Sequence, residues 1–265
     1  MKKLNKFRRL LSLLSDNGLR WTSYFILCYL FKHFIHFQHV VINALNRRMK
    51  SLEMRYKLPG DHSIARNYAM WQNYNWEKRG EEWTPSSEWK QSLIDEVMLK
   101  YMEPGKTILE VGPGAGRWSE TLQKIARHLI LVDLSDKCIE LCKKRFSQYG
   151  NVEFFMNDGI NLDFVPSETI DFIWSFDVFV HIRVDDTERY LIEFSRILKK
   201  GGRGIIHHAK EGGLHGGWRS NMTAELFLDM LKKHGLTLIT QFDSWGNDER
   251  FNVCFYHDII TVFEK

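Results

Sequence analysis

An apolar run that ends in three closely spaced glycines restricts the fold of this chain more than any other feature. The stretch ILEVGPGAGRW covers residues 108–118 and has glycines at positions 112, 114 and 116. A buried strand followed by a glycine turn and a helix is typical of the first unit of a parallel α/β sheet. The chain has 265 residues, which suits one such domain with an extension.

Apolar strands and helical segments alternate from residue 86 onward. We predict strands at about 107–112, 128–133, 152–158, 170–176, 202–208, 236–243 and 252–264. We predict helices at 86–101, 117–126, 135–146, 185–199 and 223–234, with Gly201 ending the fourth. This order predicts an α/β fold: a Rossmann-like, seven-stranded, mostly parallel sheet with helices on both faces, spanning residues 86–265.

The spacing of the glycines limits what the loop can approach. Arg117 stands where the dinucleotide fingerprint GxGxxG has its third glycine, and no Gly-Lys-Ser/Thr of a phosphate-binding P-loop follows. Glu110, just before the loop, is a poor neighbour for pyrophosphate and a good one for a cation. Asp133 ends the second strand, where a carboxylate accepts hydrogen bonds from ribose hydroxyls. The site therefore suits a nucleoside that carries positive charge and no phosphate, as S-adenosyl-L-methionine does.

These residues resemble the class I S-adenosylmethionine-dependent methyltransferases. The resemblance covers about residues 86–265 and rests on LEVGPGAG, LVDLS, NDG, DFIWSFDVFVHI and LKKGGRGII. It implies that the glycine loop passes the methionine part, that Asp133 holds the ribose and that Asp158 holds the adenine amine. The cofactor-binding residues expected from it are Glu110, Gly112, Gly114, Gly116, Asp133, Leu134, Asp158, Gly159 and Ser175. EEWTPSSEWK, together with the glycine loop, also resembles bacterial methyltransferases of the type 11/12 kind from surface-glycan gene clusters.

Methyl transfer to a hydroxyl needs a base near the strand ends. His181 follows the fourth strand, His207 and His208 end the fifth, and Asp177 is a further candidate. Adjacent residues of a strand point to opposite faces, so at most one of His207 and His208 is expected to face the cleft. An anchoring role in its loop is an equally open interpretation of His181. The usual paired acids of a metal-dependent methyltransferase are not evident, and we expect no metal.

Four aromatic residues and one arginine, on both sides of the predicted core, are candidates for acceptor binding. They are Tyr74, Trp76, Trp83, Trp218 and Arg219, the last two after a loop with glycines at 212, 213, 216 and 217. Simple packing against the domain explains them equally well. We expect O-methylation of a small molecule or glycan, most of all a sugar or surface-glycan precursor. The alternatives are a quinone or lipid methyltransferase at the membrane and a noncatalytic methyltransferase-like scaffold.

The N-terminal segment, residues 1–57, is basic and predicted to be helical. It has 12 Lys and Arg against two acids, whereas the rest of the chain has 25 basic and 31 acidic residues. The basic character is thus confined to this segment, and we expect no nucleic-acid partner. A polar stripe separates its apolar residues and comprises Lys32, His36, His39 and Asn43.

Two interpretations of this helix stay open. It lies on an anionic membrane surface through residues 1–50, or it packs on protein. We expect a cytoplasmic protein, peripheral at the inner face of the membrane in the first case, with reduced thiols. Residues 58–85 are predicted to form an aromatic-rich linker or lid. The oligomeric state is left open.

Overall fold

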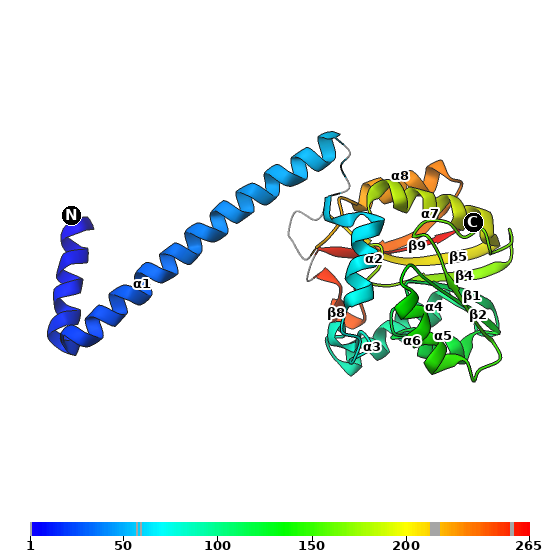
Figure 1. Ribbon diagram of the computed structural model, residues 1–265, viewed down its shortest axis with the longest axis horizontal. Helices are drawn as coiled ribbons and strands as arrows, with labels where there is room; N and C mark the ends of the chain where they lie inside the picture. Colours follow the sequence, from blue (N-terminus) through cyan, green and yellow to red (C-terminus); the bar gives the residue numbers. More distant parts are fainter. Residues whose placement is uncertain (1, 57, 59, 213–217, 255–256) are drawn as a thin grey trace. The chain divides into compact units, whose positions relative to one another are not determined.

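The computed structural model describes residues 2–56, 58, 60–212, 218–254 and 257–265 (Figure 1). The chain forms two compact units, Met1–Leu58 and Pro59–Lys265. The aromatic segment predicted as a linker or lid therefore lies, from Pro59 on, within the same unit as the α/β sheet.

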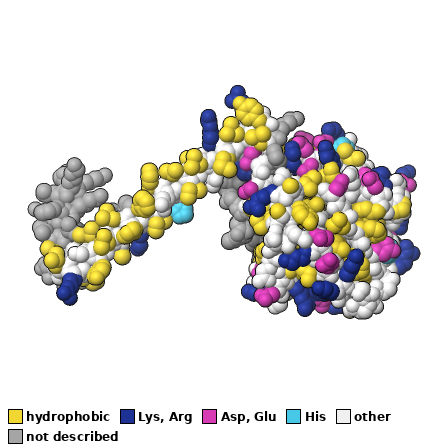
Figure 2. Space-filling model, in the orientation of Figure 1, with side chains coloured by type: hydrophobic (Ala, Val, Ile, Leu, Met, Phe, Trp, Pro, Cys, Tyr) yellow, Lys and Arg dark blue, Asp and Glu magenta, His cyan; other side chains and the backbone are white. Residues whose placement is uncertain are grey.

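The first unit consists of the helix α1 (Lys2–Tyr56), whose backbone leaves helical geometry at Gly18. The predicted N-terminal helical extension is confirmed. Large apolar side chains are exposed along it, as the yellow side chains in Figure 2 show. Its portion Gly18–Glu53 is long and apolar enough to cross a membrane, judged by length and composition alone.

A seven-stranded sheet with the order β3-β2-β1-β4-β5-β9-β6 forms the centre of the second unit. The strands are β1 (Thr107–Val111), β2 (His128–Asp133), β3 (Val152–Met156), β4 (Ile170–Ser175), β5 (Leu198–Ala209), β6 (Thr237–Phe242) and β9 (Asp258–Glu264). Only β9 runs antiparallel to its neighbours. The predicted fold class is confirmed.

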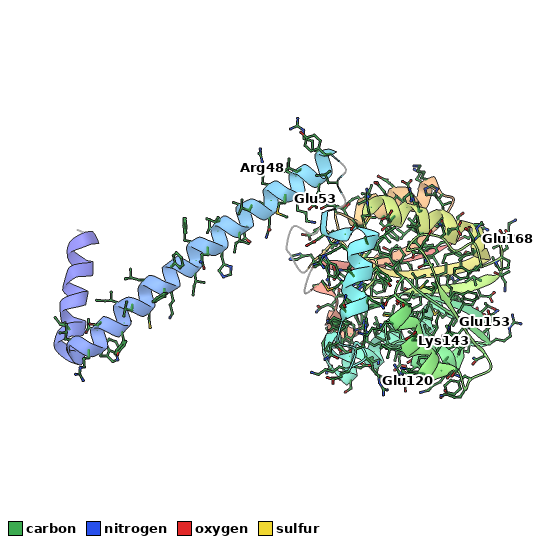
Figure 3. All side chains as sticks on the ribbon, viewed as in Figure 1. Arg48, Glu53, Glu120, Lys143, Glu153 and Glu168 are labelled. Carbon is green, nitrogen blue, oxygen red and sulfur yellow. The ribbon has the colours of Figure 1, made fainter. Side chains whose placement is uncertain are left out.

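Helices cover both faces of the sheet (Figure 1). They are α2 (Ile64–Asn73), α3 (Ser87–Leu93), α4 (Leu99–Tyr101), α5 (Ser119–Ile125), α6 (Asp136–Phe146), α7 (Val184–Ile197) and α8 (Ala224–Lys233). A π-helical turn, Ile94–Met98, joins α3 to α4. Short 3-10 turns lie at Gly60–His62, Glu81–Trp83 and Asn247–Glu249. Charged residues such as Glu120, Lys143 and Glu153 lie at the surface of this unit (Figure 3).

Side-chain caps explain where three of these helices begin. Ser86, Ser135 and Thr223 each accept a hydrogen bond from the backbone N–H three residues later, at the starts of α3, α6 and α8. Such a cap satisfies a donor that the first helical turn leaves unpaired.

Two predicted boundaries were wrong. The fourth predicted helix, 185–199 with Gly201 as its stop, ends at Ile197, because Leu198 already pairs with Ile170 in the sheet. Gly201, at φ 75°, lies inside β5, where the register shifts. The predicted last strand is divided into β9 and a residue pair, β8 (Phe251–Asn252), which forms a hairpin with β7 (Ser244–Trp245).

Apolar clusters on the two faces of the sheet form the core. Leu109 and Val132 belong to one cluster, whereas Ile108 and Leu131 belong to the other. Strands buried on both faces explain why β1 and β2 read as continuous apolar runs. The parallel strands β1, β2, β4 and β5 end at one edge, and this edge carries the site described next.

Candidate active site

The glycine loop after β1 packs more closely on its neighbours than side chains would allow. A Cβ on Gly112, at φ 74°, would stand 2.4 Å from Cγ2 of Val178. A Cβ on Gly114, at φ 56°, would stand 2.8 Å from the ring of Trp76. Both φ values also lie in the left-handed region that glycine adopts without strain. The loop thus requires glycine at these two positions.

Asp133 presents a buried carboxylate beside this loop. It accepts hydrogen bonds from the backbone N–H of Gly114 at 3.2 Å and of Ser135 at 2.9 Å. Burial raises the pKa of this carboxyl to about 6, against the lowering effect of those hydrogen bonds. At neutral pH Asp133 is ionised and can accept further hydrogen bonds.

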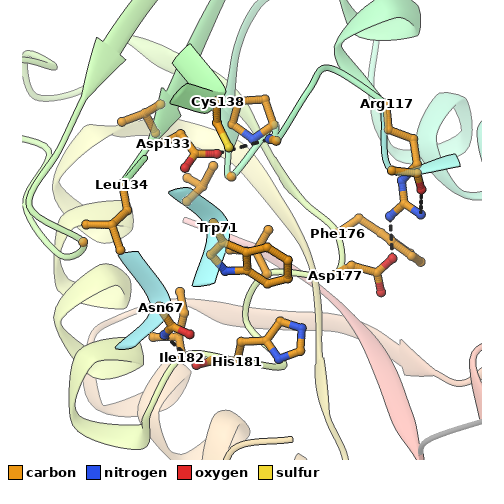
Figure 4. Close-up of a pocket in the computed structure, with 18 of the residues that line it drawn as sticks. Asn67, Trp71, Arg117, Asp133, Leu134, Cys138, Phe176, Asp177, His181 and Ile182 are labelled. Atoms are coloured by element: carbon orange, nitrogen blue, oxygen red, sulfur yellow. Dashed lines mark hydrogen bonds and ion pairs between the residues drawn. The ribbon is translucent and has the colours of Figure 1, made fainter. Parts of the chain in front are cut away.

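A cavity that encloses about 910 Å³, here called the loop pocket, opens over the glycine loop and Asp133 (Figure 4). Its floor comes from the ends of β1 and β2, and its cover includes Asn67 and Trp71 of α2. Five predicted cofactor-binding residues line it: Gly112, Gly114, Asp133, Leu134 and Gly159. A cavity lined mostly by apolar side chains, with a few polar groups among them, is typical of small-molecule sites.

The other predicted cofactor residues have structural roles. The Asp158 carboxylate accepts hydrogen bonds from the backbone N–H of Ile160 and of Asn161, so it closes its own turn. Ser175 donates from its hydroxyl to the carbonyl of Val111 at 2.8 Å.

Glu110 and Gly116 support the loop from beneath. Burial raises the pKa of Glu110 to about 8, and its carboxyl accepts a hydrogen bond from Ser119 at 2.6 Å. Gly116 gives room to the ring of Phe146, which a Cβ there would meet at 2.5 Å.

A second, open cavity of about 1370 Å³ adjoins the loop pocket and is called the aromatic pocket. Its lining includes four of the predicted acceptor residues: Tyr74, Trp83, Trp218 and Arg219. Trp76 instead lines the loop pocket. Residues 213–217, with three of the four loop glycines, lie outside the described residues.

Both pockets share a wall. It is formed by Trp71, Trp83, Phe176, Asp177 and His181. A group bound in one pocket can therefore meet a group bound in the other at these side chains.

His181 has its tautomer set by a backbone carbonyl. Its Nδ1 lies 2.7 Å from the oxygen of Trp218, which can only accept, so Nδ1 carries the hydrogen and Nε2 is an acceptor. Burial, reinforced by Arg219, lowers the pKa of His181 to about 3. The ring packs against Trp218 at 4.4 Å and Trp71 at 5.5 Å between centroids. A neutral imidazole thus stands at the shared wall.

Ion pairs link a row of side chains that begins at Arg117, in the loop pocket, and continues along the aromatic pocket through Asp177, His207, Asp258 and Arg219. His207 Nδ1 lies 3.2 Å from Asp177 Oδ1, and its Nε2 lies 3.4 Å from Asp258 Oδ2. Burial opposes charge on His207, but the two carboxylates prevail and raise its pKa. Likewise, Arg117 and His207 hold the pKa of Asp177 well below its usual range in spite of burial. Basic and acidic side chains thus alternate along the row.

His208 lies on the opposite side of β5 from His207. Its Nε2 lies 2.7 Å from the hydroxyl of Thr261, and its ring stacks on Phe227 at 4.0 Å. Burial lowers its pKa to about 3. These contacts place His208 in the core under α8, away from the acceptor side, and give it a packing role instead of the predicted catalytic one.

Three of the seven non-glycine residues with positive φ in the described part of the chain line the two pockets. Asp177, Trp218 and Arg79 have φ values of 60°, 54° and 59°, and each lines a pocket. Non-glycine residues in the left-handed region cost free energy and tend to gather at functional sites.

Sequence reasoning missed several lining residues, above all Asn67, Trp71, Phe176 and Asp258. Trp71 belongs to the aromatic density around residues 68–89, but nothing in its spacing distinguishes it from its neighbours. Asn67 precedes the region of family resemblance, and only the fold brings it to the loop pocket.

The described residues contain no group of three or more His, Cys, Asp and Glu side chains arranged to hold a metal ion.

Comparison with known proteins identifies the domain. A family model described as "Methyltransferase domain" matches residues 108–202. This stretch of the chain is therefore similar to methyltransferase domains. The matched region holds the glycine loop, Asp133 and His181, which all line the loop pocket or the shared wall.

The curated relatives are similar to this chain over only part of their own length. The chain is 30% identical over 128 residues to a ubiquinone biosynthesis O-methyltransferase of Coxiella burnetii, which is 46% of this chain and 53% of that protein. It is 29% identical over 99 residues to phosphoethanolamine N-methyltransferase 1 of Zea mays, 37% of this chain and 20% of that protein. The chain thus spans about half the length of the Coxiella relative and less of the maize one.

Solved structures share the fold of the methyltransferase domain. A TehB-like SAM-dependent methyltransferase from Corynebacterium glutamicum superposes with a TM-score of 0.56 at 22% identity, covering 74% of this chain and 98% of that one. The N-methyltransferase NodS from Bradyrhizobium japonicum, in complex with S-adenosyl-L-homocysteine, gives 0.55 at 16% identity, covering 76% and 96%. The predicted family and fold are confirmed.

The residues of the loop pocket fit the methyl donor that this family implies, S-adenosylmethionine. Asp133 is buried and ionised at neutral pH, and the glycine loop lets the backbone approach a ligand closely. Aromatic rings of Trp71, Trp76 and Phe176 line the same space and suit a sulfonium through cation–π attraction.

Proposed function

We propose that this protein is an S-adenosylmethionine-dependent O-methyltransferase whose acceptor is a sugar or surface-glycan precursor. The observation that carries the proposal is the wall shared by the loop pocket and the aromatic pocket, with a neutral histidine in it. Such a wall brings a donor and an acceptor together and excludes water between them.

The chemistry follows from the groups at this wall. S-adenosylmethionine would supply a methyl group on a sulfonium, whose C–S bond breaks as the acceptor oxygen bonds the methyl carbon in line, with S-adenosylhomocysteine leaving as the neutral thioether. His181 takes the hydroxyl proton on Nε2, while the Trp218 carbonyl holds the ring through Nδ1–H. Burial and Arg219 lower the pKa of His181, and the charge of Asp177 offsets part of that lowering and so favours the imidazolium that forms. Asp133 holds the ribose and orients the donor.

The lining of the aromatic pocket favours a neutral sugar over an anionic one. Indole rings such as Trp83 and Trp218 offer flat faces for the C–H surface of a sugar ring. Glu82 and Asp258 offer carboxylate oxygens as acceptors for hydroxyl groups. Arg219 makes a charge-assisted pair with Asp258, with its Nε at 3.0 Å and its Nη2 at 2.7 Å from Oδ2 of that carboxylate. A phosphate would have to compete with that carboxylate.

A quinone or lipid acceptor is the second candidate. It is supported by the name of the Coxiella relative and by the apolar surface of α1. The charged row at the base of the aromatic pocket argues against it, because a prenyl or acyl chain gains nothing from such groups.

The proposal is tested with the purified full chain in two steps. Calorimetry with S-adenosyl-L-homocysteine should show saturable binding, and a well-folded protein that ignores this ligand would instead favour a noncatalytic scaffold. Transfer of a labelled methyl group is then measured to neutral sugars and glycosides, to their phosphorylated forms, and to a soluble catechol quinol analogue. Preference for neutral sugars supports the first candidate, whereas exclusive use of the quinol analogue establishes the second.

We also propose that α1 lies on an anionic membrane surface. Its apolar side chains Leu30, Phe34 and Phe37 are each more than half exposed within their own unit. Lys32 and His36 belong to the opposing polar stripe, and basic residues such as Arg48 (Figure 3) follow it. A basic helix with a broad apolar face is typical of interfacial binding.

Vesicle flotation of the full chain tests this second proposal. The wild type should float with vesicles that contain phosphatidylglycerol and should do so less with phosphatidylcholine alone. The variant Phe34→Ser/Val41→Ser should stay at the bottom, whereas the matched change His36→Ser/Asn43→Ser on the polar stripe should float. Failure of the wild type to float, together with a dimer in solution, would favour a protein partner for α1.

A further inference from the structure

We propose that Asn67 of α2 binds the nucleoside half of the methyl donor and couples donor binding to the acceptor side. The inference rests on the proposed function, because it assigns a further residue to the same loop pocket. Asn67 lies outside residues 108–202, which the family model matches. It is therefore a feature of this chain beyond the shared domain.

The orientation of the Asn67 amide is fixed by a backbone carbonyl. Its Nδ2 donates to the oxygen of His181 at 2.9 Å, and that oxygen can only accept. Oδ1 must then be the opposite atom. The residue is 8% exposed, and Oδ1 finds no hydrogen-bond partner among the described residues.

A buried acceptor without a partner is costly unless a ligand supplies the donor. Such a group gives up its hydrogen bonds to water and receives none in return. Asn67 lines the loop pocket, so a ligand there is the available donor. Asn67 is thus a buried residue positioned to contact a ligand in the loop pocket.

The neighbours of Asn67 indicate which part of the donor it meets. Ile64, one turn earlier, packs over Gly159, where a Cβ would stand 3.1 Å from Cγ2 of Ile64. Leu134, next to Asp133, lines the same end of the loop pocket (Figure 4). If Asp133 holds the ribose, this end takes the nucleoside. A nucleoside offers ribose hydroxyls and the adenine amine as hydrogen-bond donors to Oδ1.

The same side chain also holds the segment that carries the base. Asn67 binds the backbone of His181, while Trp71, four residues on along α2, packs against the His181 ring and against Trp218 at 5.6 Å. A hydrogen bond from the ligand to Oδ1 therefore stabilises α2 in the position that it has in this structure. In that position α2 holds both His181 and the wall of the aromatic pocket. We expect the donor to bind before the acceptor.

Calorimetry on the full chain tests the contact. The probes are S-adenosyl-L-homocysteine and 5′-methylthioadenosine, which shares the nucleoside but lacks the amino-acid end. Asn67→Ala should weaken binding of both by about tenfold, the size expected for one buried hydrogen bond. The matched control is Asn73→Ala on the same helix, whose exposed amide donates only to the carbonyl of Ala69 at 2.7 Å. It should bind like the wild type.

Hydrogen exchange over residues 64–73 tests the coupling. S-adenosyl-L-homocysteine should protect this segment in the wild type and in Asn73→Ala, and protect it far less in Asn67→Ala. Asn67→Ser, which keeps a small polar group, replaces the alanine variant if thermal melting shows that alanine unfolds the domain.

Each other outcome overturns a distinct claim. Equal affinity of Asn67→Ala and Asn73→Ala would overturn the inference and leave the proposed function intact. Weakened binding of S-adenosyl-L-homocysteine alone would move the contact to the amino-acid end and overturn the nucleoside assignment. A wild type that binds neither probe would overturn the inference and the proposed function together.

Discussion

The floor and the cover of the two pockets are built in different ways. The floor comes from strand ends in one contiguous region, where backbone N–H groups of Gly114 and Ser135 hold Asp133 in place. The cover comes from α2 and from the segment around Trp218, far apart in sequence, and is held by packing of aromatic rings. The residues for the methyl donor can therefore be found from their spacing in one stretch of sequence. The residues that select the acceptor come from distant segments that only the fold brings together.

The largest expected effect concerns His181, the residue that joins floor and cover. His181→Ala should lower kcat by about a thousandfold, within the range that general-base catalysis contributes. Its affinity for S-adenosyl-L-homocysteine should change little, because the loop pocket keeps Asp133. Initial rates at saturating donor, with calorimetry on the same samples, measure both.

His208→Gln is the control for this substitution, since His208 packs in the core and should affect stability more than rate. A greater loss of kcat in His207→Gln than in His181→Ala, at unchanged melting temperature, would assign the base to the charged row instead.

Asp133 and Asp158 show how far sequence spacing reaches. Both follow parallel strands, and the family resemblance implies a cofactor role for both. In the structure Asp133 faces the loop pocket, whereas the Asp158 carboxylate is taken by backbone N–H groups of its own turn. Strand ends can be predicted from apolar runs, but the local turn that captures a carboxylate depends on backbone angles that these runs do not specify.

The aromatic residues of the cover show a different limit of prediction from sequence. Tyr74, Trp83 and Trp218 were predicted as acceptor residues from their kind and density, and they line the aromatic pocket. Asn67 and Trp71 were not predicted, because a single helix of ten residues gives no sign of which face meets the sheet edge. Long-range packing decides that, and it has no local signature.

Substitution of the two aspartates tests the floor directly, and we expect the second largest effect, on donor affinity, from Asp133. Asp133→Ala should weaken binding of S-adenosyl-L-homocysteine by about a hundredfold, because the ribose loses charge-assisted hydrogen bonds in a buried place. Asp158→Ala should weaken it by less than about threefold, the cost of a loosened turn. Calorimetry at pH 7.5 measures both. Equal losses would mean that Asp158 leaves its turn to meet the adenine.

The smallest effect is the pH dependence of donor binding, which again separates the two aspartates. Burial raises the pKa of Asp133 to about 6, whereas backbone hydrogen bonds lower the pKa of Asp158 in spite of partial burial. Below pH 6 Asp133 is protonated in the free protein and loses its preference for hydroxyl donors. Affinity for S-adenosyl-L-homocysteine should then fall by up to about tenfold between pH 6 and pH 5.

Other buried groups near the loop pocket do not produce this fall. Glu110, with a pKa of about 8, stays protonated throughout the interval, and His181, with a pKa of about 3, stays neutral. Asp133→Asn cannot titrate, so its weaker binding should be independent of pH between 5 and 7, while Asp158→Asn should keep the wild-type profile. A wild-type affinity that stays constant down to pH 5 would show that Asp133 is not the acid that the donor needs ionised, and the contrast between the two strand ends would lose its electrostatic basis.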